Sequence, residues 1–207
     1  DANFALVRFD ETGTVDSTFG NNGVAFTNIF TLETANKMVL LNDGSIIIAG
    51  YYFTGGSNYD MLFVKYDSNG NYDNNFGANG YIVKDVSSDN GDEALDIGIL
   101  SDGNIIAGGY SFGNSGQLVF YKFDDNGNPC SDFGTSGLKT VPFSIYQKNS
   151  GFGMDILEDD SFVIVGGSDS NNTLIARIDS DGNLITAFDK GVVEVDVDMN
   201  DHANDIY

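Results

Sequence analysis

The sequence predicts an all-β fold made of short strands joined by tight turns. Glycine occurs 26 times and proline twice among the 207 residues, as expected where turns interrupt many strands. Short apolar or alternating runs recur along the chain, and no segment sustains the 3.6-residue apolar period of an amphipathic helix. The remaining observation is a long internal repeat.

One stretch occurs in four related versions, which begin at Leu6, Phe63, Phe120 and Ala176. In the second version it reads FVKYDSNGNYDNNFGANG. The aspartate that opens its turn stands at positions 10, 67, 124 and 179, so successive copies are 57, 57 and 55 residues apart. A fixed period of this size indicates a repeat architecture.

Each period contains four predicted strands. In one copy they are expected at 35–41, 45–53, 60–66 and 81–86, with Asp43-Gly44 in the first hairpin, and in the next copy at 92–100, 105–110, 118–123 and 137–143. Four-stranded units at this spacing are typical of β-propeller blades. A β-sandwich would not explain the repetition, and a parallel β-helix usually has shorter coils. We therefore predict a β-propeller segment of about three and a half four-stranded blades with a 57-residue repeat.

The predicted division treats residues 1–207 as a single partial propeller. Residues 1–30 form the second half of a blade, 31–87, 88–143 and 144–199 form one blade each, and 200–207 begin the next. Propellers typically close with about four to eight blades. We therefore expect further blades of the same parent protein, or a second chain, to complete the ring. Because open sheet edges pair readily, the chain on its own is expected to associate.

The chain is strongly acidic. It has 31 Asp and Glu against nine Lys and Arg, a formal charge of −22. Such a charge disfavours nucleic acid and anionic membrane surfaces as partners. No apolar run is long enough to insert into a membrane as a helix, and the start shows no signal segment. The lone cysteine, Cys130, leaves the redox compartment open.

Several spacings together resemble a known repeat family. The residues are Phe4-Ala5-Leu6-Val7-Arg8-Phe9-Asp10, then Gly13, Asp16, Phe19-Gly20 and Gly23, followed by Asp43-Gly44-Ser45-Ile46-Ile47-Ile48-Ala49-Gly50. They resemble the bacterial delta-60 repeat, a β-propeller family of unknown function. The resemblance implies a large secreted or surface protein, often a type IX secretion substrate, and implies no catalytic residues. Later copies depart from the pattern: Asp160 replaces a hairpin glycine, Cys130 and Ile185 replace a turn aspartate, and Asp189 replaces the glycine after phenylalanine.

Four cations keep one position in the repeat: Arg8, Lys65, Lys122 and Arg177. Each lies two residues before the turn aspartate and therefore on the same strand face. A row of this kind suits an anion-binding ring, but in so acidic a chain structural pairing is the favoured interpretation. The expected partners are Asp10, Asp67, Asp124 and Asp179, or an acid on the next blade.

The Asp-x-x-Gly turns offer a candidate metal site. Asp67, Asn69, Asn71 and Asp73 place oxygen-bearing side chains at alternate positions, as calcium loops do. However, tight turns prefer the same residue types, and the spacing departs from that of an EF-hand. No cofactor is predicted for the chain other than calcium at this loop.

Two groups of aromatic residues also recur. Phe19, Phe76, Phe133 and Phe188 are expected to pack between adjacent blades, the following glycine, where present, taking a positive φ, with a sugar-binding platform as the alternative. Several tyrosines near strand ends suit either ordinary burial or glycan stacking. These are Tyr51, Tyr52, Tyr59, Tyr72, Tyr110 and Tyr146.

No catalytic constellation is recognisable in the sequence. His202 is the only histidine and Cys130 has no base nearby in the chain. We expect a module that is not an enzyme, located extracellularly or on the bacterial cell surface. It would serve as a scaffold or an adhesin-like platform that binds protein or glycan. The alternative is a glycan-active propeller enzyme with its site in blade-top loops or in further blades. The sequence identifies no specific ligand.

Overall fold

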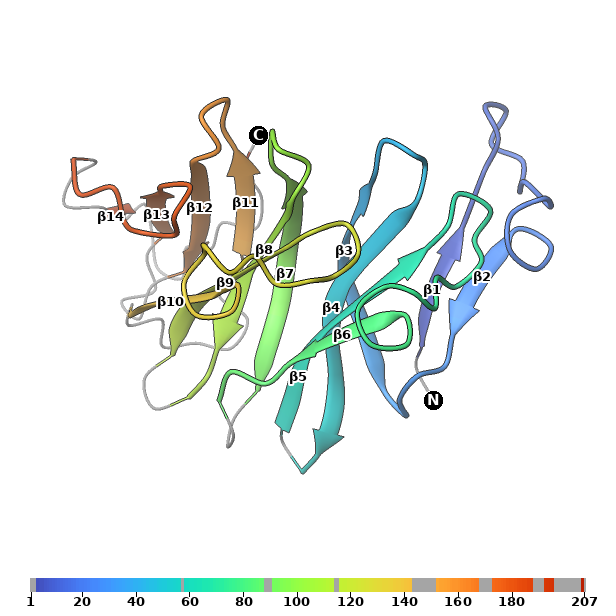
Figure 1. Cartoon of the computed structure of the whole chain (residues 1–207), viewed down its shortest axis with the longest axis horizontal. Helices are drawn as coiled ribbons and strands as arrows, with labels where there is room; N and C mark the ends of the chain where they lie inside the picture. Colours follow the sequence, from blue (N-terminus) through green and yellow to red (C-terminus); the bar gives the residue numbers. More distant parts are fainter. Residues whose placement is uncertain are drawn as a thin grey trace.

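The secondary structure of the described residues consists of β-strands. The computed structural model describes residues 3–56, 58–87, 91–113, 116–142, 152–167, 173–187, 192–195 and 206. Within these ranges the strands form four antiparallel sheets that follow one another along the chain and stand side by side like the sectors of a fan (Figure 1). No helix in the described ranges has the length and apolar character needed to cross a membrane. The predicted all-β propeller fold is confirmed.

Each sheet is one blade, and we number the blades 1 to 4 in chain order. Blade 1 contains β1 (Phe4–Val7) and β2 (Val24–Thr27). Blade 2 contains β3 (Glu33–Leu40), β4 (Ile46–Gly55), β5 (Asn58–Tyr66) and β6 (Tyr81–Lys84). Blade 3 contains β7 (Asp92–Ile99), β8 (Ile105–Ser111), β9 (Gln117–Phe123) and β10 (Leu138–Pro142). Blade 4 contains β11 (Phe152–Ile156), β12 (Phe162–Gly167), β13 (Thr173–Ile178) and β14 (Val192–Val195).

Strands pair in chain order within every four-stranded blade. The eight strands expected in blades 2 and 3 all occur, and their ends differ from the expected ones by at most two residues. The agreement reflects the strength of the local signals, which are apolar runs bounded by Asp, Asn and Gly turns. The expected beginning of another blade at 200–207 lies outside the described residues apart from Ile206.

The hydrophobic core lies between neighbouring blades. Leu62 and Val64 on β5 pack against Phe4 of blade 1, whereas Met61 and Phe63 on the same strand join the cluster shared with blade 3. Because side chains alternate along a strand, β5 presents apolar residues to both neighbouring blades and is buried along almost its whole length. The propeller is therefore held together by inter-blade packing.

The first strand of a blade packs against the preceding blade. β7 contacts β3, β4 and β5 of blade 2, and β11 contacts β7 of blade 3. β3 occupies the corresponding place in blade 2 and contacts β1. The short connection from β6 to β7 therefore brings the end of one blade next to the beginning of the next.

Candidate functional site

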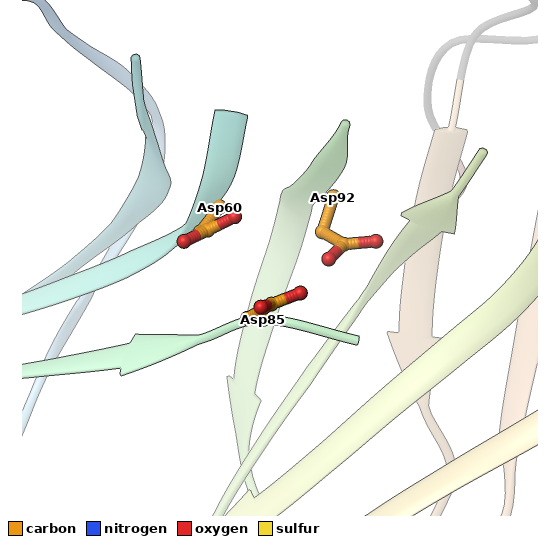
Figure 2. Close-up of side chains that lie close together, drawn as sticks. All are labelled: Asp60, Asp85 and Asp92. Atoms are coloured by element: carbon orange, nitrogen blue, oxygen red, sulfur yellow. The ribbon is translucent and has the colours of Figure 1, made fainter. Parts of the chain in front are cut away.

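Three carboxylates meet where blade 2 passes to blade 3. Asp60 lies near the start of β5, Asp85 follows directly after β6, and Asp92 opens β7. One oxygen of each carboxylate lies within 4.8 Å of the others, and Figure 2 shows the three side chains gathered between these strands. We call this group the junction cluster. Carboxylate oxygens at this spacing suit a hard cation.

Asp92 is the buried anchor of the junction cluster. It is fully buried, and its Oδ2 accepts hydrogen bonds from the backbone N–H groups of Val86 (2.6 Å) and Ser87 (3.0 Å). Burial raises the pKa of Asp92 and the charge of Asp85 adds to the rise, although hydrogen bonds from Ser111, Val86 and Ser87 oppose it. Asp92 thereby holds the connection from β6 to β7 against the first strand of blade 3.

Asp60 is buried, and only one of its two carboxylate oxygens has a hydrogen-bond partner among the described residues. Its side chain is 6% exposed, and its Oδ2 accepts a hydrogen bond of 3.3 Å from the Tyr52 hydroxyl. Its Oδ1 is buried and has no hydrogen-bond partner among the described residues. Burial raises the pKa of Asp60, and the charges of Asp85 and Asp92 raise it further against the opposing effect of Tyr52. Burial together with Asp60 also raises the pKa of Tyr52 to about 12, so Tyr52 stays a donor at neutral pH.

The preceding junction, between blades 1 and 2, has a different charge. Phe4 pairs with Thr27 in blade 1 as Met61 pairs with Lys84 in blade 2. Asn3, which precedes Phe4, is therefore the counterpart of Asp60. Asn28, which follows Thr27, is the counterpart of Asp85. Glu33 opens β3 as Asp92 opens β7. Its carboxylate accepts three backbone N–H bonds, from Ile29 (2.9 Å), Phe30 (2.7 Å) and Phe4 (3.2 Å). One satisfied carboxylate and two neutral amides thus stand where the next junction has three carboxylates.

The junction cluster is not recognisable in the sequence. Its three acids lie outside the turn motif, and each reads as an isolated acid beside a strand. Two of the three positions could be found by comparing the strand ends of the copies. Both positions carry an oxygen-bearing side chain in each blade: Asn3 and Asn28 in blade 1, and Asp60 and Asp85 in blade 2. The third position cannot be found in this way, because Glu33 and Asp92 are offset from the 57-residue spacing by two residues (92 − 33 = 59).

In the loop predicted to bind calcium, the aspartate side chains accept hydrogen bonds from other residues of the same loop. Asp67 Oδ1 accepts the backbone N–H groups of Asn69 and Asn71, each at 2.8 Å, and its Oδ2 accepts the Asn71 side-chain amide at 3.0 Å. Asp73 Oδ1 accepts the backbone N–H of Asn75 at 3.0 Å. Burial alone would raise the pKa of Asp67, but the bonds from Asn71 and Asn69 bring it below its ordinary value. Calcium at this loop stays a prediction.

Every cation of the repeat row contacts a carboxylate, as predicted. Arg8 lies 2.8 Å from Asp16, and Lys65 lies 3.9 Å from Asp73. The expected partners were wrong, however. The turn-opening residues Asp10, Asp67, Asp124 and Asp179 each accept hydrogen bonds from backbone N–H groups of their own turn. These bonds orient the four carboxylates toward their own turns, and the cations pair with other acids of the same blade.

Blades 3 and 4 use a second set of partners. Cys130 and Ile185 stand where blades 1 and 2 have Asp16 and Asp73. In these blades the cation reaches instead to the aspartate of the first hairpin. The pairs are Lys122 with Asp102 at 3.7 Å and Arg177 with Asp159 at 3.0 Å. Loss of one carboxylate from the repeat is thus compensated by another within the same blade.

A substitution at Lys65 tests the structural role of this row. Its side chain is 8% exposed and its Nζ donates a bond of 2.7 Å to the Asp125 carbonyl of blade 3. Lys65→Met keeps the apolar stem but removes these contacts, and we expect it to lower the free energy of unfolding by about 1–3 kcal/mol. Arg177→Met is the control: its side chain is 35% exposed, so a loss below about 1 kcal/mol is expected. Urea unfolding of both variants gives the comparison, and equal losses would contradict the prediction.

The repeated phenylalanines are core residues, as expected. Phe19, Phe76 and Phe133 are at most 2% exposed. A Cβ atom added to Gly70 of blade 2 would lie 2.9 Å from the Phe19 ring, so this ring fills the space between two blades. The glycines that follow them have φ near +55°, where other residues are strained. Phe188 lies outside the described residues.

The tyrosines divide by burial. Tyr59 and Tyr110 are 3% exposed and belong to the interior, whereas Tyr51, Tyr52 and Tyr72 are half-buried. The Tyr72 hydroxyl donates a bond of 2.7 Å to the Asn79 carbonyl.

Burial raises the pKa of the Cys130 thiol although Lys122 opposes the change, which disfavours a reactive thiolate. Tyr146 and His202 lie outside the described residues.

Comparison with known proteins identifies the same architecture. A family model described as a domain of unknown function (DUF5122) beta-propeller matches residues 41–76. The match spans β4, β5 and the Asp67–Asp73 turn, which is the part of blade 2 that carries the repeat motif. No curated protein matches the chain. The chain is therefore built from β-propeller repeats similar to this family.

Proposed function

We propose that this chain belongs to a non-catalytic β-propeller module that serves as a scaffold or an adhesin-like platform for protein or glycan. We further propose that its repeats are of the delta-60 type and that the protein is secreted or displayed on a bacterial surface. The observation that carries the proposal is the use of the repeated motif to join blades. Because the polar groups of the motif make contacts within and between blades, we expect ligands to be recognised by the loops that vary between copies.

The joining contacts repeat from blade to blade. The backbone N–H of Gly20 donates to the Asn69 carbonyl of the next blade at 2.7 Å, and Gly77 donates to Asn126 at 2.8 Å. Arg8 follows the same direction with a bond of 2.6 Å to the Ser68 carbonyl. Equivalent residues thus connect the turns of blades 1 and 2 to the turn of the following blade. Such a ladder supports a rigid platform.

The composition supports the proposed location. A formal charge of −22 with nine basic residues keeps a protein soluble and repels anionic surfaces. Secretion of the parent protein by the type IX pathway belongs to the same proposal, through the resemblance to delta-60 repeats.

A combined binding and turnover assay tests the function. The 207-residue chain is immobilised and exposed to a panel of bacterial and plant polysaccharides and extracellular proteins, while reducing ends are measured in solution. We expect saturable binding to a member of the panel without product formation. Product release that one carboxylate substitution abolishes would contradict the proposal and would establish the glycan-active enzyme instead.

The exposed face of β3 supports the proposed partners, which are further blades of the same protein or a second chain that completes the ring. β7 is largely buried against three strands of blade 2, whereas β3 is exposed along most of its length. Met38 and Leu40 on β3 are 54% and 65% exposed. A hollow of about 420 Å³ lies beside them, between β1 and β3. Two strands preceding β1 in the blade order would cover this face and pair with the edge of β1.

Light scattering on the purified chain tests this arrangement. Because apolar side chains and an unpaired edge are exposed together, we expect the chain to associate, and Met38→Lys to weaken the association. Val15→Lys provides the control, since Val15 is similarly exposed (44%) but lies in a turn of blade 1. A monodisperse monomer with cooperative unfolding would contradict the proposed partners.

A further inference from the structure

The junction cluster contains a buried oxygen that lacks a donor. Asp60 is more than nine-tenths buried, and its Oδ1 makes no hydrogen bond among the described residues. Its other oxygen is taken by Tyr52. A buried polar atom without a partner is costly, and native structures usually supply one. The carboxylate of Asp60 lies beside those of Asp85 and Asp92, so a ligand held by all three acids would supply this partner.

A positively charged partner is needed there. Three carboxylates share the site, and none of the ion pairs within the described ranges includes any of them. The cation nearest in sequence, Lys84, places its Nζ 4.4 Å from the centre of the Tyr121 ring. A water molecule would satisfy a hydrogen bond but would leave the repulsion between the carboxylates in place.

The spacing of the oxygens suits calcium. Ligand oxygens lie about 2.3–2.6 Å from Ca²⁺, so any two of them are at most about 4.6–5.2 Å apart, and Ca²⁺ accepts irregular coordination whereas Mg²⁺ demands a near-ideal octahedron. The oxygens of the cluster lie within 4.8 Å of one another. From these observations we propose that Asp60, Asp85 and Asp92 bind a calcium ion that fastens blade 2 to blade 3, with water completing its coordination. This is a function separate from the proposed recognition role.

Each of the three acids would have a different role in binding the ion. Asp92 is oriented by the backbone N–H groups of the blade connection, which donate to its Oδ2, and by the Ser87 hydroxyl, which donates to its Oδ1 at 3.4 Å, so its carboxylate is held in place to receive the ion. Asp60 contributes a carboxylate from β5 of blade 2, one oxygen of which has no hydrogen-bond partner among the described residues. Asp85 is exposed and gives the ion access from solvent. The ion would therefore contact elements of both blades and stabilise their packing.

The junction of blades 1 and 2 is a natural comparison within the same chain. Asn3 and Asn28 replace two of the carboxylates by neutral amides, and the carboxylate of Glu33 is satisfied by backbone donors. We therefore assign the calcium site to the junction of blades 2 and 3 and not to its counterpart. The variants Asp60→Asn and Asp85→Asn each bring the acidic junction closer to the neutral one.

Calorimetric titration and thermal unfolding of the 207-residue chain test the proposal. After chelation, calcium is expected to bind at one site and, at 100 times its dissociation constant, to raise the unfolding midpoint by about 5–10 °C. Asp85→Asn is expected to weaken binding at least about tenfold, because the variant loses a charged ligand. Asp60→Asn is expected to abolish the calcium shift while melting above the parent chain in chelator, because a buried uncompensated charge is removed.

Two matched variants distinguish the site from its competitors. Asp132→Asn makes the same change of charge at an exposed residue outside the junction cluster, and the calcium shift is expected to persist. Asp73→Asn changes the turn loop, and the shift is again expected to persist. The proposal is overturned if calcium leaves the midpoint unchanged, if Asp85→Asn keeps full affinity, or if Asp73→Asn abolishes binding. An equal shift with magnesium would overturn the assignment of calcium.

Discussion

Replacement of Gly50 by alanine is expected to destabilise the chain strongly, because the added methyl group would collide with the backbone of the neighbouring strand. A Cβ atom at Gly50 would lie 1.9 Å from the Thr34 carbonyl oxygen on the neighbouring strand. The obstacle is backbone, which cannot rotate away as a side chain can, so β3 and β4 would have to separate. We expect a loss of about 3 kcal/mol or more in the free energy of unfolding, or about 6–12 °C in the midpoint.

The same close approach recurs in blade 3. A Cβ atom at Gly109 would lie 1.8 Å from the Glu93 carbonyl oxygen. In both blades the strand register shifts beside the glycine, between Ala35 and Lys37 and between Ala94 and Asp96. A bulge of this kind brings the two backbones together and explains why both blades have a glycine at this position. Gly109→Ala should therefore reproduce the effect of Gly50→Ala.

Gly13→Ala is the control for backbone strain alone. Gly13 has φ of +80°, but a Cβ atom there would meet nothing within 4 Å. Its replacement should cost about 1 kcal/mol. Thermal and urea unfolding of the three variants compare the two effects, and a Gly50→Ala variant as stable as Gly13→Ala would show that the strands separate without significant cost.

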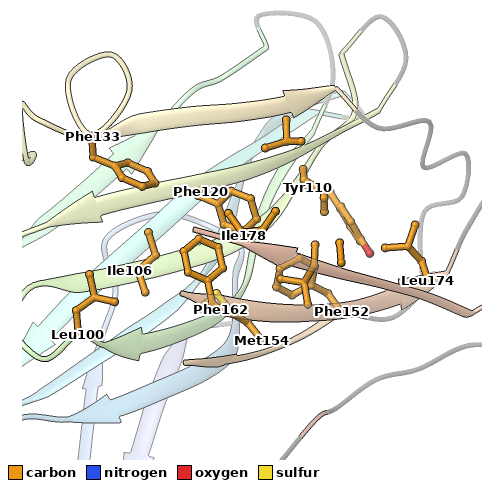
Figure 3. Packing of buried hydrophobic residues seen from close by; sticks show 14 residues of the cluster. Leu100, Ile106, Tyr110, Phe120, Phe133, Phe152, Met154, Phe162, Leu174 and Ile178 are labelled. Carbon is orange, nitrogen blue, oxygen red and sulfur yellow. The ribbon is translucent and has the colours of Figure 1, made fainter. Parts of the chain in front are cut away.

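Removal of the Phe120 ring is expected to weaken the attachment of blade 4. Phe120 on β9 is fully buried, and its ring centre lies 4.9 Å from that of Phe162 on β12. Figure 3 shows both rings in the cluster between blades 3 and 4, near Ile106 and Ile178. Phe120→Ala leaves a cavity at this interface and should lower the free energy of unfolding by about 3–5 kcal/mol.

Limited proteolysis locates this effect within the chain. Because neighbouring repeats stabilise each other through their interfaces, blade 4 should be cleaved first in Phe120→Ala. Phe26→Ala is the matched control, since Phe26 is 61% exposed and its removal should cost below about 1 kcal/mol. Cleavage that begins in blade 1 or 2 of the Phe120→Ala variant would contradict a core divided between blades.

The strands of blades 2 and 3 could be predicted because their signals are local. The Asp43-Gly44 and Asp102-Gly103 turns bound apolar runs whose length and composition suit strands. Asp160 shows how far such chemistry tolerates change: it replaces the hairpin glycine and still adopts φ of +58°. Asp is among the few residues that accept this conformation at modest cost, so the hairpin of blade 4 persists.

The partners of the cation row could not be predicted from spacing. Asp10 and Asp67 are two residues from their cations and on the same strand face, but their oxygens bind backbone N–H groups of the turn. The competition between a nearby cation and the turn backbone depends on where the donors point. Only the folded turn decides it.

The repeat, the strand order within each blade and the apolar positions between blades could be predicted, since each follows from short-range pattern and period. The tertiary structure decided which polar groups meet. Asp60 lies on the third strand of blade 2, Asp85 follows the fourth strand of that blade, and Asp92 opens the first strand of blade 3. No local pattern relates the three. They converge because the first strand of each blade packs against the blade before it, which brings distant carboxylates to one junction.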